Sequence, residues 1–228
     1  MECKLKKDTV CNEEILWNND SQIRIETEFS IPETNGAVSK LLCAFVKPVI
    51  TSKSKAGESL LLDGFAAVKL IYIDDRDLIE TFDTSAVFSK NLDLPFSLDD
   101  TIVNTVIFSE KQNVKALNER KINFSLEFSV KTTVKKQTQI EFISAQNDDC
   151  FEYKCEFATV CKNSVYGEKN IILDEEIELS EVHAPIGKIL HYSYNATTDD
   201  CKIMSNKTML KGVITVSIVY LSDDEYKP

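Results

Sequence analysis

The sequence predicts an all-β protein built from antiparallel, β-sandwich-like repeat units, about one and a half copies of one unit, with at most short helices. Two observations predict this class. Residues 22–75 align without a gap on residues 170–223 at an offset of 148 residues. Nearly every apolar run alternates with a period of two, as strands with one buried face do. Because a repeat unit is a packing unit, half a unit rarely buries its own apolar face.

Identical residues at equivalent positions define the repeat. They are Gly64 and Gly212, Val68 and Val216, Tyr72 and Tyr220, and Asp75 and Asp223. We expect a complete unit over residues 1–147 and the first half of a second unit over residues 148–228, packed against the first; the counterpart of residues 81–145 is missing. Both tyrosines should be at least half buried. Each glycine should begin a strand where a side chain would crowd a neighbour or the backbone needs a positive φ.

The alternation places individual strands. Residues 120–130 present one apolar face, Ile122, Phe124, Leu126, Phe128 and Val130. Residues 22–31 do the same, and their inward positions recur as Ile171, Leu173, Ile177 and Leu179. Residues 64–73 and 212–221 are apolar on both faces, which favours strands packed fully on one face and partly on the other. A further alternating run starts at residue 151.

Two short segments and several acidic pairs interrupt the strands. Residues 36–43 and their equivalents 184–191 have a spacing that suggests a turn or two of helix. Predicted turns carry Asp74-Asp75, Asp99-Asp100, Asp148-Asp149, Asp199-Asp200 and Asp223-Asp224, because a short carboxylate can accept hydrogen bonds from its own backbone. A calcium site is the alternative interpretation, although none of these loops has the ligand spacing of a calcium loop. Asn118-Glu119 reads as a hairpin tip.

Composition narrows the class of protein. The chain has 228 residues, 43% of them hydrophobic, and a formal charge of −11. Such acidity opposes nucleic-acid binding, which requires clustered Lys and Arg. The apolar runs are too short to span a bilayer, and the first residues lack the apolar stretch of a signal peptide. We therefore expect synthesis in the cytoplasm, no membrane span and no nucleic-acid partner.

The seven cysteines leave at least one thiol unpaired within the chain, and no CxxC motif occurs. Thr9-Val10-Cys11 recurs as Thr159-Val160-Cys161, two residues out of the main register. One interpretation is that these thiols are reduced and pack as small apolar groups. The other is that Cys11 and Cys161 cross-link copies of the protein.

No catalytic constellation is evident. Nucleophile, phosphate-binding and metalloprotease motifs are absent from the sequence. The two histidines, His183 and His191, occur where the first copy has Asn35 and Cys43, so we interpret both as incidental. We predict neither catalytic residues nor a metal, cofactor or small-molecule ligand. Trp17 is expected at the edge of the core, with a surface anchor as the alternative.

Three blocks of sequence resemble the SPOCS domain family of spore-envelope proteins. They are a Gly-initiated strand ending in Tyr (Gly64 to Tyr72), an apolar segment closing in Pro-Phe (Leu92 to Phe96), and Asn118-x-Arg120-Lys121 entering an alternating strand. Only the first recurs in the second copy, as Gly212 to Tyr220. Members similar to this chain continue into a C-terminal LysM module, and this sequence has none.

The resemblance implies a non-enzymatic protein that assembles the spore coat or envelope by protein–protein contact, with other envelope proteins and itself as partners. Its expected location is the spore envelope of a spore-forming bacterium. The alternative function is a carbohydrate- or peptidoglycan-binding β-sandwich, in which Trp17, Tyr192 or Tyr194 would stack on sugar rings.

Overall fold

The structure is a computed structural model that describes residues 5–146, 156, 171–205 and 207–223. Its elements are all strands, which confirms the predicted all-β class. They are β1 (Leu5–Ser30), β2 (Val38–Ala56), β3 (Ser59–Asp74), β4 (Ile79–Asp93), β5 (Thr101–Ala116), β6 (Lys121–Gln146), β7 (Ile186–Met204) and β8 (Lys207–Ser222). All neighbouring strands pair antiparallel.

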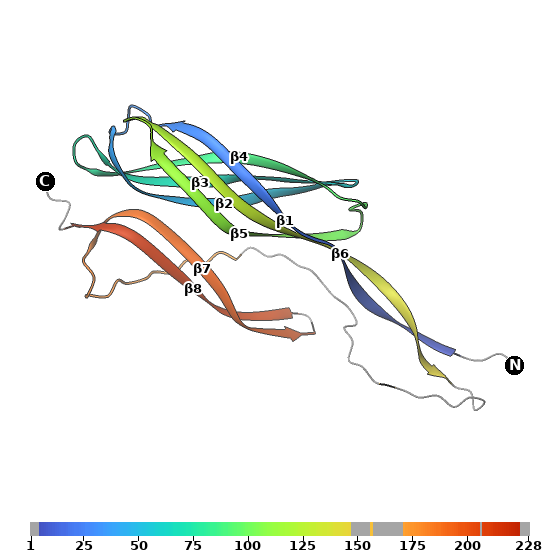
Figure 1. Ribbon diagram of the computed structural model, residues 1–228. Helices are drawn as coiled ribbons and strands as arrows, with labels where there is room; N and C mark the ends of the chain where they lie inside the picture. Colours follow the sequence, from blue (N-terminus) through green and yellow to red (C-terminus); the bar gives the residue numbers. More distant parts are fainter. Residues whose placement is uncertain (1–4, 147–155, 157–170, 206, 224–228) are drawn as a thin grey trace.

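Strands β1–β6 form a sandwich of two three-stranded sheets. One sheet has the order β1-β6-β5 and the other β2-β3-β4, and the two are stacked as layers (Figure 1). The alternation of β3 and β6 directs one side-chain row of each central strand into the space between the layers. Leu60, Leu62, Leu70, Tyr72, Ile122, Phe124, Leu126 and Val130 are completely buried there. This core belongs to residues 5–146, the first unit.

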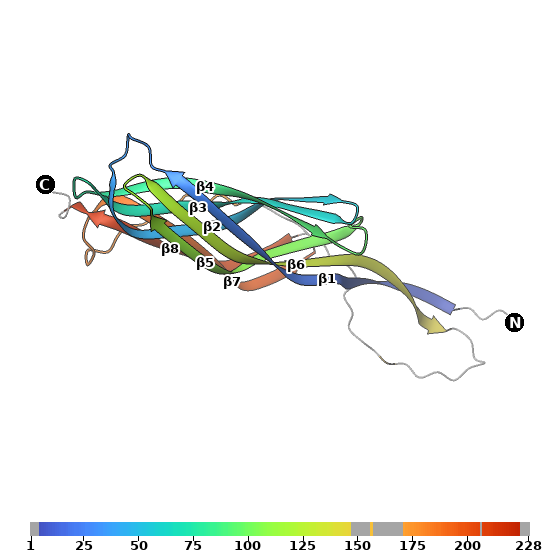
Figure 2. The ribbon, with the colours of Figure 1, turned by 45° about the horizontal axis from the view of Figure 1, so that its top comes forward.

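The ends of β1 and β6 extend past the other strands as a two-stranded ribbon, visible in both views (Figure 1, Figure 2). No second sheet of the described strands covers this ribbon, and Ile140, Phe142 and Ile143 are exposed on it.

The hairpin β7–β8 repeats β2–β3 in its pairing. In β2–β3 the register shifts at Val38/Lys40, Leu41/Cys43 and Ile50/Ser52. In β7–β8 it shifts at Ile186/Lys188, Ile189/His191 and Thr198/Asp200, which are the same three positions moved by 148 residues. Bulges are sequence-specific features of a strand pair, so the duplication extends to backbone geometry.

The helix predicted at residues 36–43 and 184–191 is wrong. Both segments enter strands, β2 and β7, and each contains two register shifts. A bulge inserts one residue into the two-residue alternation, and the resulting apolar spacing of three and four residues imitates a helix.

Two further expectations about the second copy need correction. Asp199-Asp200 lies inside β7 at a register shift, not in a turn. Residues 171–180 were expected to repeat the β1 strand, but they form no strand and their apolar side chains are exposed. In the first unit β1 pairs with β6 alone. Because the described second unit has no β6 equivalent, this segment has no strand to pair with. Apart from Glu156, the run starting at residue 151 lies outside the described residues, and so does the pair Asp148-Asp149.

Candidate functional site

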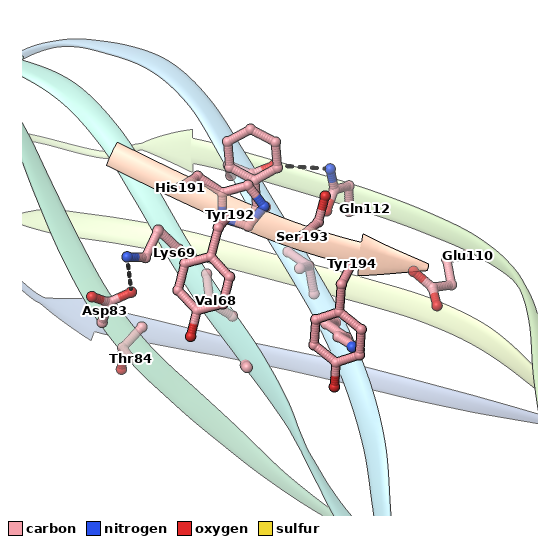
Figure 3. A pocket seen from close by; sticks show the side chains of 15 residues that line it. Val68, Lys69, Asp83, Thr84, Glu110, Gln112, His191, Tyr192, Ser193 and Tyr194 are labelled. Atoms are coloured by element: carbon pink, nitrogen blue, oxygen red, sulfur yellow. Dashed lines mark hydrogen bonds and ion pairs between the residues drawn. The ribbon is translucent and has the colours of Figure 1, made fainter. Parts of the chain in front are cut away.

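A cleft separates the hairpin from the first unit. Its volume is about 880 Å³, and β7 forms one wall while the outer face of sheet β2-β3-β4 and part of β5 form the other (Figure 3). Phe45, Lys69 and Asp83 are in register across that sheet. The remaining lining is Ala44, Val46, Lys47, Ala67, Val68, Thr84, Glu110, Gln112, His191, Tyr192, Ser193 and Tyr194.

Three side-chain contacts connect β7 to the first unit. The rings of His191 and Phe45 are stacked, with centroids 3.7 Å apart and planes 8° from parallel. The Lys47 ammonium lies 4.7 Å from the centre of the Tyr194 ring, a cation–π distance. The Lys188 ammonium lies 3.2 Å from a Glu80 carboxylate oxygen. Leu190 is the one side chain of the described hairpin that is buried.

Polar groups of the first unit line part of the cleft. Lys69 forms an ion pair with Asp83 at 3.2 Å, and Gln112 donates a hydrogen bond to the Ala44 carbonyl. Burial lowers the pKa of His191, and the Lys69 charge lowers it further, so the neutral imidazole is favoured. Burial also raises the pKa of Glu110. These groups could bind polar hydroxyl or amide ligands between aromatic rings.

The inner side of the hairpin is apolar and exposed. Tyr192 is paired with Ile218 and Tyr194 with Val216 across the two strands. The two tyrosines that line the cleft therefore lie on the same face of the hairpin as Ile218 and Val216. We call Leu210, Ile214, Val216 and Ile218 the open face. Their equivalents in the first unit, Leu62, Ala66, Val68 and Leu70, are 0–2% exposed, whereas the open-face residues are 40–63% exposed. The open face therefore corresponds to a surface that is buried in the first unit, and no described sheet covers it in the second.

The repeat glycines have the same environment in both units. A Cβ on Gly64 would collide with the Val49 carbonyl oxygen, and one on Gly212 would collide with the equivalent carbonyl of Thr197. Close backbone approach explains the glycines, because neither has a positive φ. Both lie within a strand and not at its start, which corrects that part of the expectation.

The repeat tyrosines also make equivalent contacts. The Tyr72 hydroxyl donates to the Gly36 carbonyl at 3.4 Å, and the Tyr220 hydroxyl donates to the Ala184 carbonyl at 2.9 Å. Tyr72 is completely buried and Tyr220 is partly buried. Each tyrosine therefore anchors the loop that precedes its hairpin.

The motif at the β5–β6 turn has a structural role. The Asn118 side chain accepts hydrogen bonds from the backbone N–H groups of Arg120 and Lys121 at 2.9 and 2.8 Å. The Arg120 guanidinium donates to the carbonyls of Pro32 and Asn35, so it caps the β1–β2 loop. The predicted hairpin tip at Asn118-Glu119 is present.

Asp74 is a key residue that the repeat did not reveal. Its buried carboxylate accepts hydrogen bonds from the backbone N–H groups of Arg76 and Leu78 and from the Arg76 guanidinium. Asp75, the residue shared by both copies, is exposed, and so is Asp223. The position equivalent to Asp74 is Ser222, so identity between the copies could not indicate it. The signal was the turn pattern of consecutive aspartates.

The other residues that the sequence pointed to do not lie together at one site. Cys11 is a partly buried free thiol in β1, opposite Gln139, and Cys161 lies outside the described residues. Trp17 packs against the edge of the core and does not line the cleft. His183 is exposed in a turn, apart from the stacked His191. Val68 lies in the core, while Val216 belongs to the open face.

Within the described residues, no group of three or more His, Cys, Asp or Glu side chains is arranged to hold a metal ion. The same residues contain no helix long and apolar enough to cross a bilayer. No family model, curated protein or solved structure matches this chain.

Proposed function

We propose that this chain is a non-enzymatic assembly protein that acts by protein–protein contact through the open face of β7–β8. The observation that carries the proposal is the exposure of Leu210, Ile214, Val216 and Ile218 on a hairpin whose duplicate buries the same positions. Contiguous exposed apolar side chains on an otherwise charged protein are typical of interaction surfaces.

The energetics favour a partner. Complete burial of one Val, Leu or Ile side chain contributes about 1.5–3 kcal/mol, and four such side chains lie together on the open face. The first unit does not offer an apolar surface that could exclude water from the open face, because its wall of the cleft carries Lys47, Lys69 and Asp83. A partner with an apolar surface could cover the open face.

The cellular role that we propose is assembly of a bacterial spore coat or envelope. The resemblance of residues 64–72, 92–96 and 118–121 to the SPOCS domain family supports this role. A protein made in the mother cell would then be recruited to the spore surface by its partners.

Localisation in a spore-forming bacterium tests the proposal. A fluorescent fusion of the whole chain should form a ring around the developing spore, and Val216→Asp on the open face should make it diffuse. Val213→Asp is the matched control, because Val213 is similarly exposed on the opposite side of β8. Diffuse fluorescence of the unsubstituted fusion, or an undiminished ring with Val216→Asp, would contradict the proposal.

Glycan binding in the cleft is a second candidate. Tyr192 and Tyr194 are 64% and 62% exposed and point the same way from β7 (Figure 3). Asp83 and Glu110 line the same cleft. Aromatic faces beside carboxylates suit sugar rings and their hydroxyl groups. Sedimentation with purified peptidoglycan should then be lost with Tyr192→Ala and kept with Ile203→Ala, an exposed residue outside the cleft. Equal sedimentation of the two variants would exclude this candidate.

A further inference from the structure

We propose that the chain forms a two-fold dimer in which the β1 edge of its projecting ribbon pairs antiparallel with the same edge of a second copy, in a register centred on Val10. We call residues 5–13 of β1 and 137–146 of β6 the ribbon, because the pairing of β5 with β6 ends at Lys136. The inference goes beyond the proposed function and concerns a different surface of the first unit.

The outer edge of β1 in the ribbon is regular and unpaired. Among the described strands β1 pairs with β6 alone, and their register runs without a shift from Lys7 to Ile15. The ribbon projects beyond the sandwich (Figure 1, Figure 2), so the other strands of the first unit do not block a second ribbon beside it. The unpaired backbone groups of such an edge are a template for another strand.

The charges along this edge are complementary to those of its own copy. In an antiparallel pair related by a two-fold axis, one residue lies opposite its own copy and the others pair symmetrically around it. Centring on Val10 places Lys7 of each copy opposite Glu13 of the other. Moving the centre by one or two residues in either direction leaves Lys7 opposite an uncharged side chain. The charges therefore select the Val10 register.

The ion pairs within each ribbon fit the same register. The Lys7 ammonium lies 3.2 Å from a Glu141 carboxylate oxygen, and the Lys135 ammonium lies 3.2 Å from a Glu13 carboxylate oxygen. In the dimer four neighbouring charges alternate in sign across the strands: Lys135 and Glu13 of one copy, then Lys7 and Glu141 of the other. Because exposed ion pairs contribute little free energy, these charges determine the register more than the strength of pairing.

The opposite face of the ribbon favours this register too. Val10 is paired with Ile140 within the chain, and Ile140 is 48% exposed. Centring on Val10 forms one apolar row across the dimer, with Ile140 and Val10 of one copy followed by Val10 and Ile140 of the other. A centre one residue away would set Val10 opposite Asp8 or Asn12. Cross-strand side-chain pairs are a main source of sheet stability, so both faces favour a single register.

Pairing also stabilises the ribbon itself. A sheet of two strands is marginally stable in water, and further strands are needed to make it independent of other support. Two ribbons joined along β1 form a four-stranded sheet in the order β6-β1-β1-β6. The other edge of the ribbon offers no comparable match, because residues 137–143 of β6 contain one charged side chain, Glu141. The second copy therefore pairs through β1.

Cross-linking at the two-fold axis tests the register. In a Cys11→Ser background of the whole chain, Val10→Cys places each introduced thiol opposite its own copy, at a separation that a disulfide can bridge. Asn12→Cys is the matched control, because Asn12 is on the same face of β1, is more exposed than Val10, and lies opposite Asp8 of the second copy. Mild oxidation should link Val10→Cys chains at the introduced thiols, as peptide mapping can locate, and should not link Asn12→Cys chains there.

Charge reversal tests the contact between copies. Lys7→Glu and Glu13→Lys each set like charges opposite one another in a homodimer, so each should weaken dimerisation at least about tenfold in sedimentation experiments. A mixture of the two variants pairs every reversed residue with an opposite charge and should restore the dimer. The reversals disturb the contacts with Glu141 and Lys135 equally with and without mixing. Recovery in the mixture therefore reports pairing between the two chains.

Three results would each overturn the inference. They are an unsubstituted chain that stays monomeric at every soluble concentration, equal cross-linking of the two cysteine variants, and a mixture that associates no more tightly than its components. None of them touches the proposed function, because that rests on the open face. Loss of the ring with Val216→Asp can accompany either outcome, so the two proposals fail separately.

Discussion

Val68 and Val216 occupy the same position in the two repeat units, but Val68 is 2% exposed and Val216 is 44% exposed. Their cross-strand registers, neighbouring glycines and tyrosine hydrogen bonds correspond. The difference lies in what covers them, since sheet β1-β6-β5 packs over Val68 and no described sheet packs over Val216. Val68 and Val216 thus have the same side chain and equivalent strand geometry, and they differ in burial.

Matched leucines should show this difference as stability. Leu62→Ala is expected to lower the free energy of unfolding by about 2–5 kcal/mol, because it leaves a cavity in a closed core. Leu210→Ala, at the equivalent position with 63% exposure, should change it by no more than about 0.5 kcal/mol. Urea unfolding of both variants gives the comparison. Equal losses would mean that the open face is covered in solution.

Gly64 in β3 should not tolerate a methyl group, because the β2 backbone lies close to it. Gly64→Ala would place a Cβ against the Val49 carbonyl and 2.5 Å from the Phe88 ring. Overpacking of this kind costs about 1–3 kcal/mol, so the thermal midpoint should fall. Gly57 has open space around it but a φ of 61°, and Gly57→Ala therefore reports backbone strain alone. A Gly64→Ala variant as stable as the unsubstituted chain would exclude the close approach.

Sequence alone predicted the sandwich and the inward rows of β3 and β6, because a two-residue alternation is typical of a strand with one buried face. The sequence prediction failed at residues 36–43, where two bulges change the spacing of apolar residues in a strand to one that is typical of a helix. It also failed at residues 171–180, which have a strand pattern and no strand to pair with. The cleft could not be predicted, because Phe45 and His191 meet through the placement of one unit beside the other.

Acid should weaken the β3–β4 turn through Asp74. Burial of this carboxyl opposes ionisation, but hydrogen bonds from the Leu78 N–H and from Arg76 outweigh it and hold the pKa below its usual value. A lowered folded pKa gives stability that is present above the ordinary value of about 3.9 and is lost as the pH falls through the folded pKa. The stability difference between the unsubstituted chain and Asp74→Asn should therefore be largest near pH 7 and shrink below about pH 4.

Urea unfolding at several pH values measures this difference. Asp75→Asn, at the exposed neighbouring position, is the control and should leave the pH profile nearly unchanged. A difference between Asp74→Asn and the unsubstituted chain that stays constant down to pH 3 would rule out the ionised carboxylate as its source.

Thiol reactivity should separate the described cysteines. Cys43 and Cys201 are exposed, and burial raises the pKa of the Cys43 thiol, so less of it is thiolate at pH 8. We expect Cys201 to react with a disulfide reagent before Cys43, and partly buried Cys11 to react last.

Non-reducing gels after oxidation should show ladders that Cys11→Ser and Cys161→Ser reduce. Monomer bands that stay unchanged under oxidant would remove cross-linking through these thiols.

Docking of the hairpin should depend on the protonation of His191. Burial and the Lys69 charge lower its pKa, while Asp83 raises it, so Lys69→Gln should raise the measured value and Asp83→Asn should lower it. A lowered histidine pKa favours the neutral ring in the docked state. Docking is then strongest above the ordinary value of about 6.5 and weakens as the pH falls through it. NMR titration in a His183→Gln background isolates the His191 signal. Identical pKa values in all variants would place His191 away from both charges and contradict its stacking on Phe45 in the cleft.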